Sequence, residues 1–369
     1  MIKGELLLAS GERFVGEMPA WQTDSFFGEV VFTTGMTGYV ESLTDPSFAG
    51  QILVFTYPLI GNYGVPDASL FESKKIHVRG VIVSSLMHST AHFQAQQSLL
   101  HWLKEQGIPI LTGVDTRHLA LTLRDHGVVD GVIAPANEAD GAIASYAGQR
   151  PSMSEQALHQ PRWPEQSLSH LVRSVSRTRV EEFGEGPHTI IAVDCGMKEN
   201  ILRHLRSLPI RIKVVPFDYD FTEEAFDGLF LSNGPGDPEE CVETIAHVKK
   251  VLDRNIPIFG ICLGTQILAL ALGAKTYKLR FGHRGLNQPV IRSDGRAYLT
   301  SQNHGYAVEE ASLPPDWIVS YRHLNDDTVA GIAHQSKPYF AVQFHPEAAP
   351  GPRDTTFLFQ EFYERILSH

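Results

Sequence analysis

Short apolar runs typical of buried strands alternate with amphipathic segments typical of helices in the second half of the sequence. The runs TIIAVD, RIKVVP and IPIFGI are interleaved with the helical segments MKENILRHLRSL and LGTQILALALG. Parallel strands need a crossover connection between them, so this alternation predicts a parallel sheet with helices on both faces. Ligands bind such sheets at the carboxyl ends of the strands. The ends of the apolar runs are therefore where chemistry is expected.

The first half has a different pattern. The stretches GEVVFTTG, GQILVFTY and HVRGVIVSSL predict strands broken by turns, and residues 91–107 and 116–127 predict two amphipathic helices. Prolines at 151, 161, 164 and 187 punctuate a polar stretch without a long period. We therefore expect an α/β protein with a mixed β/α domain over 1–150, a connector over 151–187 and a doubly wound, mainly parallel domain over 188–369.

Charge and cysteine content narrow the class of partner. The formal charge of −11 would repel phosphate backbones, so nucleic acid is not expected as a partner. Three cysteines in 369 residues cannot form a disulfide framework, which favours a reducing compartment. No apolar run approaches the ~18 residues of a membrane span, and the start MIKGELLLASGERF does not resemble a targeting peptide. We expect a cytoplasmic protein that does not bind a membrane.

Cys262 lies where the run IPIFGI ends, within the pentapeptide GICLG. This is the thiol counterpart of the G-x-S-x-G turn that exposes a nucleophile between a strand and a helix. A helix beginning at Leu263 would stabilise a thiolate, and the Leu263 N–H would point toward an oxyanion beside the sulfur. Free cysteine is also among the most buried residue types, so the pentapeptide alone leaves both a nucleophile and a core residue open. Cys195 and Cys241 are expected to be structural.

Two other strand ends carry candidate groups. His345 follows the apolar run YFAVQF, and alternation along an extended chain places Glu347 on the same side, where it can orient the imidazole. The loop NGPGDP, residues 233–238, follows DGLFLS and is either a plain turn or a loop whose amides approach a ligand. Neither a dinucleotide fingerprint nor a P-loop is present.

Cys, His and Glu in this order, within FGICLGTQ and HPE, resemble the catalytic triad of class I glutamine amidotransferases. GEVVFTTGMTGYVESLTDPSFAGQI, TYPLIGNYG, LSNGPGDP and SQNHGYAV together resemble the family of carbamoyl phosphate synthetase small subunits. The resemblance covers nearly the whole chain and weakens only around residues 135–187. Its N-terminal part is the most specific, because other amidotransferases of this class lack it.

The resemblance implies that Cys262 attacks the side-chain amide of L-glutamine, with His345 as base and Glu347 behind it. It also implies an oxyanion hole and a set of glutamine contacts. The oxyanion hole would comprise Gly234 and Leu263, and the glutamine contacts would comprise Ser47, Gly234, Gly236, Leu263, Gln266, Asn303, Gly305 and Tyr306. Because Ser47 belongs to the first domain, the resemblance implies a site closed by both halves. Thr265 and Tyr306 depart from the commonest family residues, histidine and phenylalanine.

By the same resemblance, ammonia released from glutamine passes to a separate large subunit in a heterodimer. That subunit would use ATP, Mg²⁺ and bicarbonate to make carbamoyl phosphate for the synthesis of arginine, pyrimidines or both. No cofactor and no metal are expected on this chain, and its end at His369 leaves no room for a fused synthetase. His283, in FGHRGLNQPV, belongs either to a structural glycine-rich loop or to a loop near the ammonia exit or the subunit contact.

Two competing hypotheses have the same fold. One is a subunit that binds glutamine or a partner without turnover, and loss of Cys262, His345 or Glu347 would favour it. The other is a free-standing hydrolase of γ-glutamyl compounds, against which the N-terminal block argues. All three triad residues are present, so the glutamine-hydrolysing subunit is the preferred hypothesis.

Overall fold

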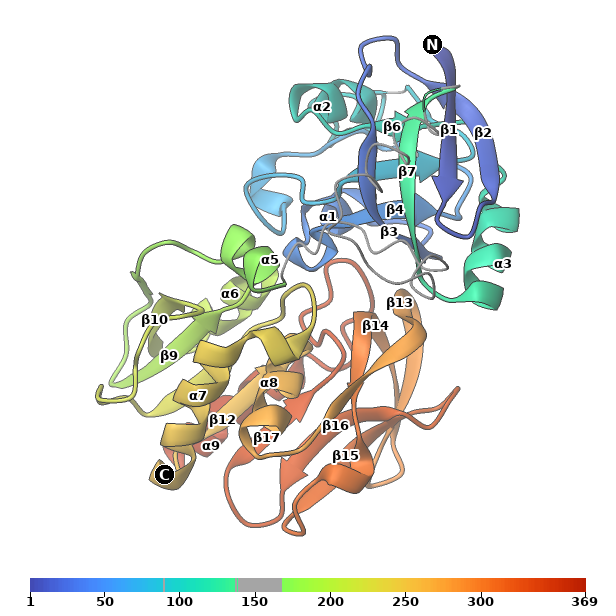
Figure 1. The fold of residues 1–369 in the computed structure, drawn as a ribbon. Coiled ribbons are helices and arrows are strands. Elements are labelled where there is room, and N and C mark those ends of the chain that lie inside the picture. The colour runs from blue at the N-terminus through green and yellow to red at the C-terminus, as the bar shows by residue number, and fades with distance from the viewer. Residues whose placement is uncertain (89, 137, 139–167) are drawn as a thin grey trace. The chain divides into compact units, whose positions relative to one another are not determined.

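The computed structural model describes residues 1–88, 90–136, 138 and 168–369. The chain divides into two compact units, Met1–Gln166 and Ser167–His369, drawn blue to green and green to red in Figure 1. Residues 151–167 of the expected connector lie outside the described residues. Residues 168–187 contain helix α5 (Leu168–Val175) and strand β8 (Glu181–Phe183) of the second unit, where the sequence suggested a linker. Among the described residues, no helix is long and apolar enough to cross a membrane.

The first unit is built on a seven-stranded mixed sheet of order β2-β1-β7-β3-β4-β5-β6. Strands β3, β4, β5 and β6 pair in parallel, whereas β1, β2 and β7 pair antiparallel. The bounds are β1 Ile2–Leu8, β2 Arg13–Met18, β3 Phe26–Thr33, β4 Gln51–Phe55, β5 Gly80–Val83, β6 Ile110–Leu111 and β7 Val129–Pro135. The strands predicted from the apolar runs of this half are thereby confirmed.

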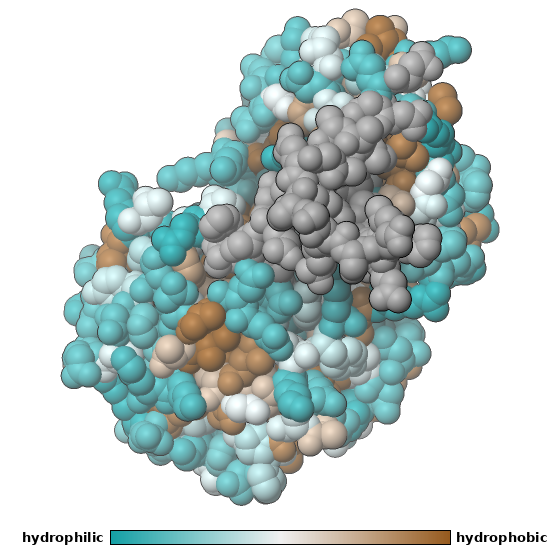
Figure 2. All heavy atoms as spheres, viewed as in Figure 1, coloured by the Kyte–Doolittle hydropathy of each residue, from teal (hydrophilic) through white to brown (hydrophobic). Residues whose placement is uncertain are grey.

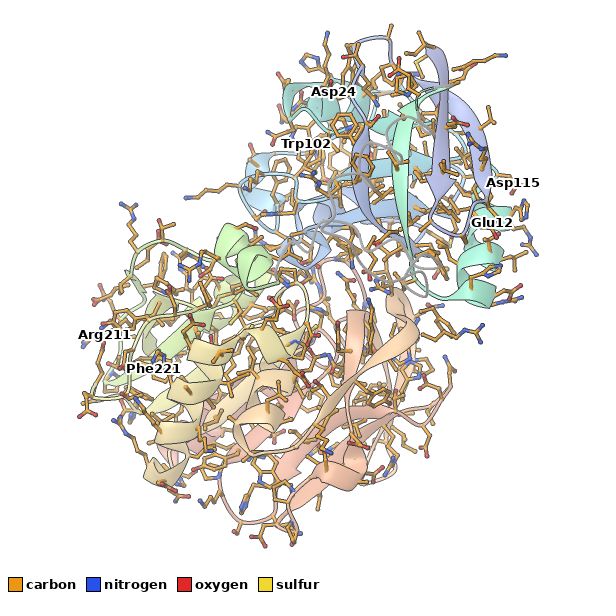
Figure 3. The ribbon with its side chains drawn as sticks, viewed as in Figure 1. Glu12, Asp24, Trp102, Asp115, Arg211 and Phe221 are labelled. Carbon is orange, nitrogen blue, oxygen red and sulfur yellow. The ribbon has the colours of Figure 1, made fainter. Side chains whose placement is uncertain are left out.

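The helices of the first unit are α1 (Tyr39–Thr44), α2 (Leu99–Glu105) and α3 (Thr116–His126). Helix α3 is confirmed, and its N-cap Asp115, labelled in Figure 3, accepts a hydrogen bond from the His118 N–H. The helix predicted over 91–107 is wrong in its first half. The backbone of Gln96 and Gln97 instead pairs with Val65, so helix α2 begins only after Ser98, whose hydroxyl accepts from the His101 N–H.

Apolar side chains pack on both faces of the first sheet. Leu53, Val81 and Val83 lie in one buried cluster with the helices α1 and α2, in which Trp102 (Figure 3) packs against Phe71 with ring centroids 5.0 Å apart. Ile52 belongs to a second cluster on the opposite face, together with residues of α3. The alternation of the strand residues between the two clusters follows from the two-residue period of a strand.

The second unit is built on a ten-stranded sheet of order β14-β13-β15-β16-β17-β12-β11-β9-β10-β8. The central strands β10, β9, β11, β12 and β17 are parallel, as the sequence predicts. These strands span Ile210–Pro216, His188–Asp194, Gly228–Leu231, Ile258–Ile261 and Tyr339–Val342 respectively. Strand β8 closes one edge in antiparallel orientation.

The sequence did not predict the antiparallel extension on the other edge of this sheet. Strands β16, β15, β13 and β14 continue the sheet beyond β17, and Figure 1 shows β13 and β14 as orange arrows and β15 and β16 in red-orange. Their bounds are β13 Thr276–Arg292, β14 Ala297–Val308, β15 Trp317–His323 and β16 Val329–His334. The extension matters for function, because β14 carries the motif SQNHGYAV.

Helices cover both faces of the parallel strands. The helices are α6 Glu199–Arg206, α7 Val242–Val251, α8 Leu263–Ala271 and α9 Phe357–Leu367. Ile191 and Val193 of β9 pack with residues of α7 and α8, whereas Ile190 packs with residues of α6 and α9. On the face drawn in Figure 2, hydrophilic side chains cover most of the described surface and hydrophobic ones gather in small patches.

Phe259 of β12 anchors an aromatic cluster that provides a test of the two-unit organisation. It is fully buried, and its ring stacks on Phe340 at 4.5 Å and meets Phe230 edge-on at 5.4 Å. We expect Phe259→Ala to destabilise the second unit by about 3–5 kcal/mol, because it leaves a cavity. Amide hydrogen exchange should accelerate in β11 and β12 but not in β4 and β5. Leu53→Ala, the matched control in the first unit, should give the reverse pattern, and equal acceleration in both units would contradict the prediction.

Candidate active site

The candidate nucleophile lies on a strained turn between strand β12 and helix α8. Cys262 has φ 54° and ψ −106°, a backbone conformation that residues other than glycine rarely adopt. Its N–H donates to the Val342 carbonyl at 2.8 Å, which fixes the turn against β17. The thiol is 2% exposed and lies 3.7 Å from the carbonyl oxygen of Asn303 on β14. The interpretation of GICLG as a nucleophile turn therefore fits the backbone geometry.

The flanking glycines are required by close contacts. A Cβ atom at Gly264 would lie 2.3 Å from the carbonyl oxygen of Leu231, and one at Gly260 would lie 2.8 Å from the Gly264 backbone. Helix α8 can therefore begin directly over strand β11 only if both positions lack a side chain. This close approach brings the helix N-terminus to the carboxyl ends of the parallel strands.

His345 and Glu347 form a buried pair just beyond strand β17. Nδ1 of His345 lies 2.7 Å from Oε1 of Glu347, and both side chains are at most 2% exposed. The His345 N–H donates to the Ser301 carbonyl of β14 at 2.8 Å, which ties the pair to the antiparallel extension. Nε2 of His345 has no hydrogen-bond partner among the described residues, which leaves this nitrogen available for chemistry.

The structure adds a fourth charged group that the sequence analysis missed. Nζ of Lys198 lies 3.0 Å from Oε1 of Glu347 and also donates to the Ala348 carbonyl. The Lys198 side chain is 2% exposed, so the pair is almost completely removed from water. Lys198 follows strand β9, and the rule of looking at strand ends could have found it, since a lysine beside a buried strand is unusual.

The electrostatics of this cluster follow from burial and charge. Burial alone would raise the pKa of Glu347, but the Lys198 ammonium and then His345 lower it. Burial likewise opposes the imidazolium form of His345, but Glu347 and then the nearby Cys262 thiol raise its pKa. Glu347 therefore stays ionised and favours a positively charged His345. The arrangement suits a histidine that accepts a proton from the thiol.

The loop after strand β11 lies against the start of helix α8. A Cβ atom at Gly234 would lie 2.2 Å from the Cys195 carbonyl oxygen and 2.7 Å from Cδ2 of Leu263, so Gly234 and Leu263 are neighbours. Outside regular helix and strand bonds, no described carbonyl accepts a hydrogen bond from either backbone N–H. Gly236 has φ 94° and turns the loop. Gly234 lies beside Leu263, which directly follows Cys262, and this arrangement is compatible with the expected oxyanion hole.

Strand β14 and helix α8 supply the other predicted glutamine contacts of the second unit. Nδ2 of Asn303 is buried without a hydrogen-bond partner among the described residues, as expected of a donor that binds a ligand. Nε2 of Gln266 donates to the Tyr306 carbonyl at 2.8 Å and to Oε1 of Gln343 at 3.0 Å. Gly305 adjoins Arg284, whose Nη2 would lie 3.3 Å from a Cβ atom there.

Other residues singled out from the sequence have separate places. Ser47 lies buried in the short 3-10 helix Pro46–Phe48 of the first unit, and its predicted contact with glutamine stays a prediction. The Thr265 hydroxyl donates to the Val342 carbonyl at 2.6 Å, so it packs against the nucleophile turn. Cys195 and Cys241 belong to the apolar core, and burial raises the pKa of both thiols. They are structural, as expected.

Comparison with known proteins agrees with this division of the chain. Residues 191–365 match the family described as glutamine amidotransferase class-I. Residues 6–133 match the family described as carbamoyl-phosphate synthase small chain, CPSase domain. The two matched segments fall in the second and the first unit respectively.

Relatives match this chain over most of its length. The arginine-specific small chain of carbamoyl phosphate synthase from Neosartorya fischeri is 45% identical over 93% of this chain and 75% of its own length. The chain belongs to the carbamoyl phosphate synthase small-chain family. The multifunctional protein CAD of Squalus acanthias is 45% identical over 97% of this chain, and URA2 of Saccharomyces cerevisiae is 44% identical over 93%. The chain spans only 16% of the length of these two multifunctional proteins.

Solved structures resemble this small-chain family member over about half of its length. A putative GMP synthase component from Thermoplasma acidophilum is 30% identical, with a TM-score of 0.44 over 49% of this chain and 94% of its own. A glutamine amidotransferase from Thermotoga maritima is 18% identical, with a TM-score of 0.39 over 49% of this chain and 99% of its own.

Replacing Lys198 tests the charge balance of the site. A lowered carboxylate pKa stabilises the fold above the unfolded value of about 4.3, and this stabilisation disappears as pH falls through the folded value. In Lys198→Met, burial raises the pKa of Glu347, so stability is lost at higher pH and falls by about 3–5 kcal/mol near neutrality. In this variant the Glu347–His345 pair should also bind an additional proton at a higher pH than it does in the wild type. The rate of Cys262 alkylation by iodoacetamide, measured by mass spectrometry, falls at low pH. The pH at which this acid limb falls should be higher in the variant than in the wild type.

The matched control for this substitution is the double variant Lys198→Met with Glu347→Gln. It removes both buried charges, so it should be more stable than Lys198→Met alone. Urea unfolding between pH 4 and 8 measures the difference. An unchanged acid limb in Lys198→Met would show that the lysine has no electrostatic part in the site.

Proposed function

We propose that this chain hydrolyses L-glutamine and supplies ammonia for carbamoyl phosphate synthesis. The observation that carries the proposal is the position of Cys262, on a left-handed turn beside the buried His345–Glu347 pair. The small-chain family membership supports glutamine as the substrate. The unpartnered Asn303 amide supports it as well, because glutamine offers acceptor oxygens for that N–H group.

In the proposed reaction, His345 takes the Cys262 proton and the thiolate attacks the side-chain amide carbon of glutamine. A carbon–sulfur bond forms, and the amide oxygen becomes an oxyanion that accepts hydrogen bonds from the Gly234 and Leu263 N–H groups. His345 then gives its proton to the nitrogen, the carbon–nitrogen bond breaks and ammonia leaves. Water attacks the resulting thioester, with His345 as base, and glutamate is released as the thiol forms again.

The side chains around the triad support this reaction in different ways. Glu347 orients Nδ1 of His345 and stabilises the imidazolium, and Lys198 keeps Glu347 ionised. Asn303, Gln266, Gly236, Gly305 and Tyr306 would contact or shape the glutamine site, and the glutamine contact of Ser47 stays a prediction. Each oxyanion donor is expected to contribute about 10²–10³-fold to the rate.

We further propose that the ammonia serves a large synthetase subunit bound as a heterodimer. A relative of which this chain covers 75% is named as an arginine-specific small chain, and CAD and URA2 are named as multifunctional proteins. ATP and Mg²⁺ would be used on that large subunit, and this chain would need no metal or cofactor. Three free cysteines fit a reducing compartment, in keeping with a cytoplasmic protein.

The decisive experiment separates glutamine hydrolysis from synthesis. The chain is assayed with its synthetase partner for glutamate release, and for carbamoyl phosphate synthesis from glutamine or from ammonium chloride. Cys262→Ser should abolish glutamate release and glutamine-dependent synthesis but leave ammonia-dependent synthesis intact, because only the first needs the thiol.

Cys241→Ser is the control for this substitution, since it replaces a thiol that lies in the core away from the triad. It should retain glutamine-dependent synthesis. Glutamine-dependent synthesis that survives Cys262→Ser would refute the nucleophile assignment. A wild-type chain that binds glutamine but releases no glutamate would favour the alternative of a binding subunit.

A further inference from the structure

A row of hydrogen bonds connects the glutamine-facing strand to a surface carboxylate. Nδ1 of His304 on β14 lies 2.7 Å from the Tyr306 carbonyl oxygen, and its Nε2 lies 3.2 Å from Nδ1 of His283 on β13. Nε2 of His283 lies 2.7 Å from Oδ2 of Asp326, in the turn between β15 and β16. His283 and His304 are register partners in the β13–β14 ladder.

This row requires one more proton than two neutral histidines hold. Its two ends, the Tyr306 carbonyl and the Asp326 carboxylate, only accept hydrogen bonds. Three contacts between the ends therefore need three N–H protons, whereas two neutral imidazoles carry two. If both rings were neutral, two lone pairs would face each other at 2.7 Å or 3.2 Å. When Asp326 is ionised, as its lowered pKa favours, three N–H protons on the two rings amount to one positive charge between His283 and His304.

The surroundings place this charge mainly on His283. Burial, and then the neighbouring His283, holds the pKa of His304 well below its usual range. Arg284 and His345 act on His304 in the same direction. Burial raises the pKa of Asp326, but the charge of His283 and its hydrogen bond lower it overall, so a carboxylate is present to balance the imidazolium.

Other groups face the row, and Nδ1 of His323 lies 3.2 Å from Oδ1 of Asp326. His323 stacks on His283 with ring centroids 4.1 Å apart, and burial and then His283 lower the pKa of His323 to about 4, so this ring is neutral. Oε1 of Gln302 lies 3.0 Å from Nε2 of His304, a contact that is attractive when the shared proton visits that nitrogen. Tyr277 lies close enough to Asp326 for its pKa to be raised by burial and then by that carboxylate.

A metal ion is a poorer explanation of the same contacts. Ligand atoms of His283, His323 and Asp326 lie within 4.8 Å of one another. The two imidazole rings, however, are stacked with only 11° between their planes. A metal ion binds in the plane of an imidazole, along the nitrogen lone pair, and one ion between stacked rings would lie far out of both planes. A proton on Nε2 of His283 needs no such rearrangement.

We propose that His283 and His304 share one extra proton, balanced by Asp326, and that this charged pair positions the segment Asn303–Tyr306 for glutamine. The Tyr306 carbonyl at the end of the row also holds Gln266, and the Asn303 carbonyl faces the Cys262 thiol. The positioning role rests on the proposed function, whereas the proton count does not. Asp326 and His283 are positioning residues, since they act on the site through His304.

The proton count is tested by nuclear magnetic resonance of the full chain labelled with ¹⁵N-histidine. We expect both ring nitrogens of His283 to carry protons at pH 7, and His304 to be protonated chiefly on Nδ1. His283→Gln and His304→Gln assign the signals, and the unfolding curve of each variant reports whether it folds. A neutral His283 at pH 7, or bound zinc found by elemental analysis of the folded chain, would overturn the proposal.

The positioning role is tested by glutamine kinetics of the complex with the synthetase subunit. In the wild type, KM for glutamine should rise about 3–10-fold as high pH removes the proton and one hydrogen bond is lost, while kcat changes little. Asp326→Asn removes the balancing charge, so the same rise should occur at lower pH. Asp326→Glu should restore the wild-type profile.

Asp327→Asn is the matched control, because Asp327 is the adjacent carboxylate and its side chain is 83% exposed. Its KM profile should equal that of the wild type. A charged His283 in the resonance experiment with an unshifted KM profile in Asp326→Asn would overturn the positioning role alone. A wild type without glutamine hydrolysis would instead refute the proposed function, and the resonance experiment would still decide the proton count.

Discussion

The candidate site depends on a single buried oxygen, Oε1 of Glu347, which contacts both His345 and Lys198. A carboxylate at this depth would take up a proton unless positive groups held it ionised. Lys198 follows β9 and His345 follows β17, so the oxygen also joins the ends of two strands that are not neighbours. Removing Lys198 takes away the buried cation that contributes most to keeping Glu347 ionised, and the fold of this end of the sheet is therefore coupled to the protonation state of the site.

The parallel centre of the second unit could be predicted from the sequence because each strand there is a short apolar run beside an amphipathic helix. The sequence singles out the three residues of the candidate triad because they follow such runs directly. The antiparallel extension could not, since β13 contains charged and glycine residues such as Arg280, Gly282 and Arg284 within its span. Lys198 was missed although it follows a predicted strand, because its partner lies 149 positions away in the sequence.

The predicted start of the helix over 91–107 in the first unit is wrong for a similar physical reason. Residues 91–98 have a composition compatible with a helix, yet Gln96 and Gln97 use their backbone groups to pair with Val65. Long-range pairing of this kind outweighs a weak helical preference, and the local sequence does not predict it. Ser98 is a good N-cap residue, and it explains where α2 begins once the preceding residues are held elsewhere.

Two charge systems, one buried and one reaching the surface at Asp326, would thus act on different parts of the proposed site. The Lys198–Glu347–His345 group acts on the reacting thiol, so disturbing it should change the chemical step. The Asp326–His283–His304 row acts on the strand that would hold the substrate, so disturbing it should change binding. Each system places a positive charge within reach of one imidazole, and His345 in turn helps to keep His304 neutral. Because the two imidazoles repel each other's protons, a charged His345 during the reaction would strengthen the preference for keeping the shared proton on His283, away from the thiol.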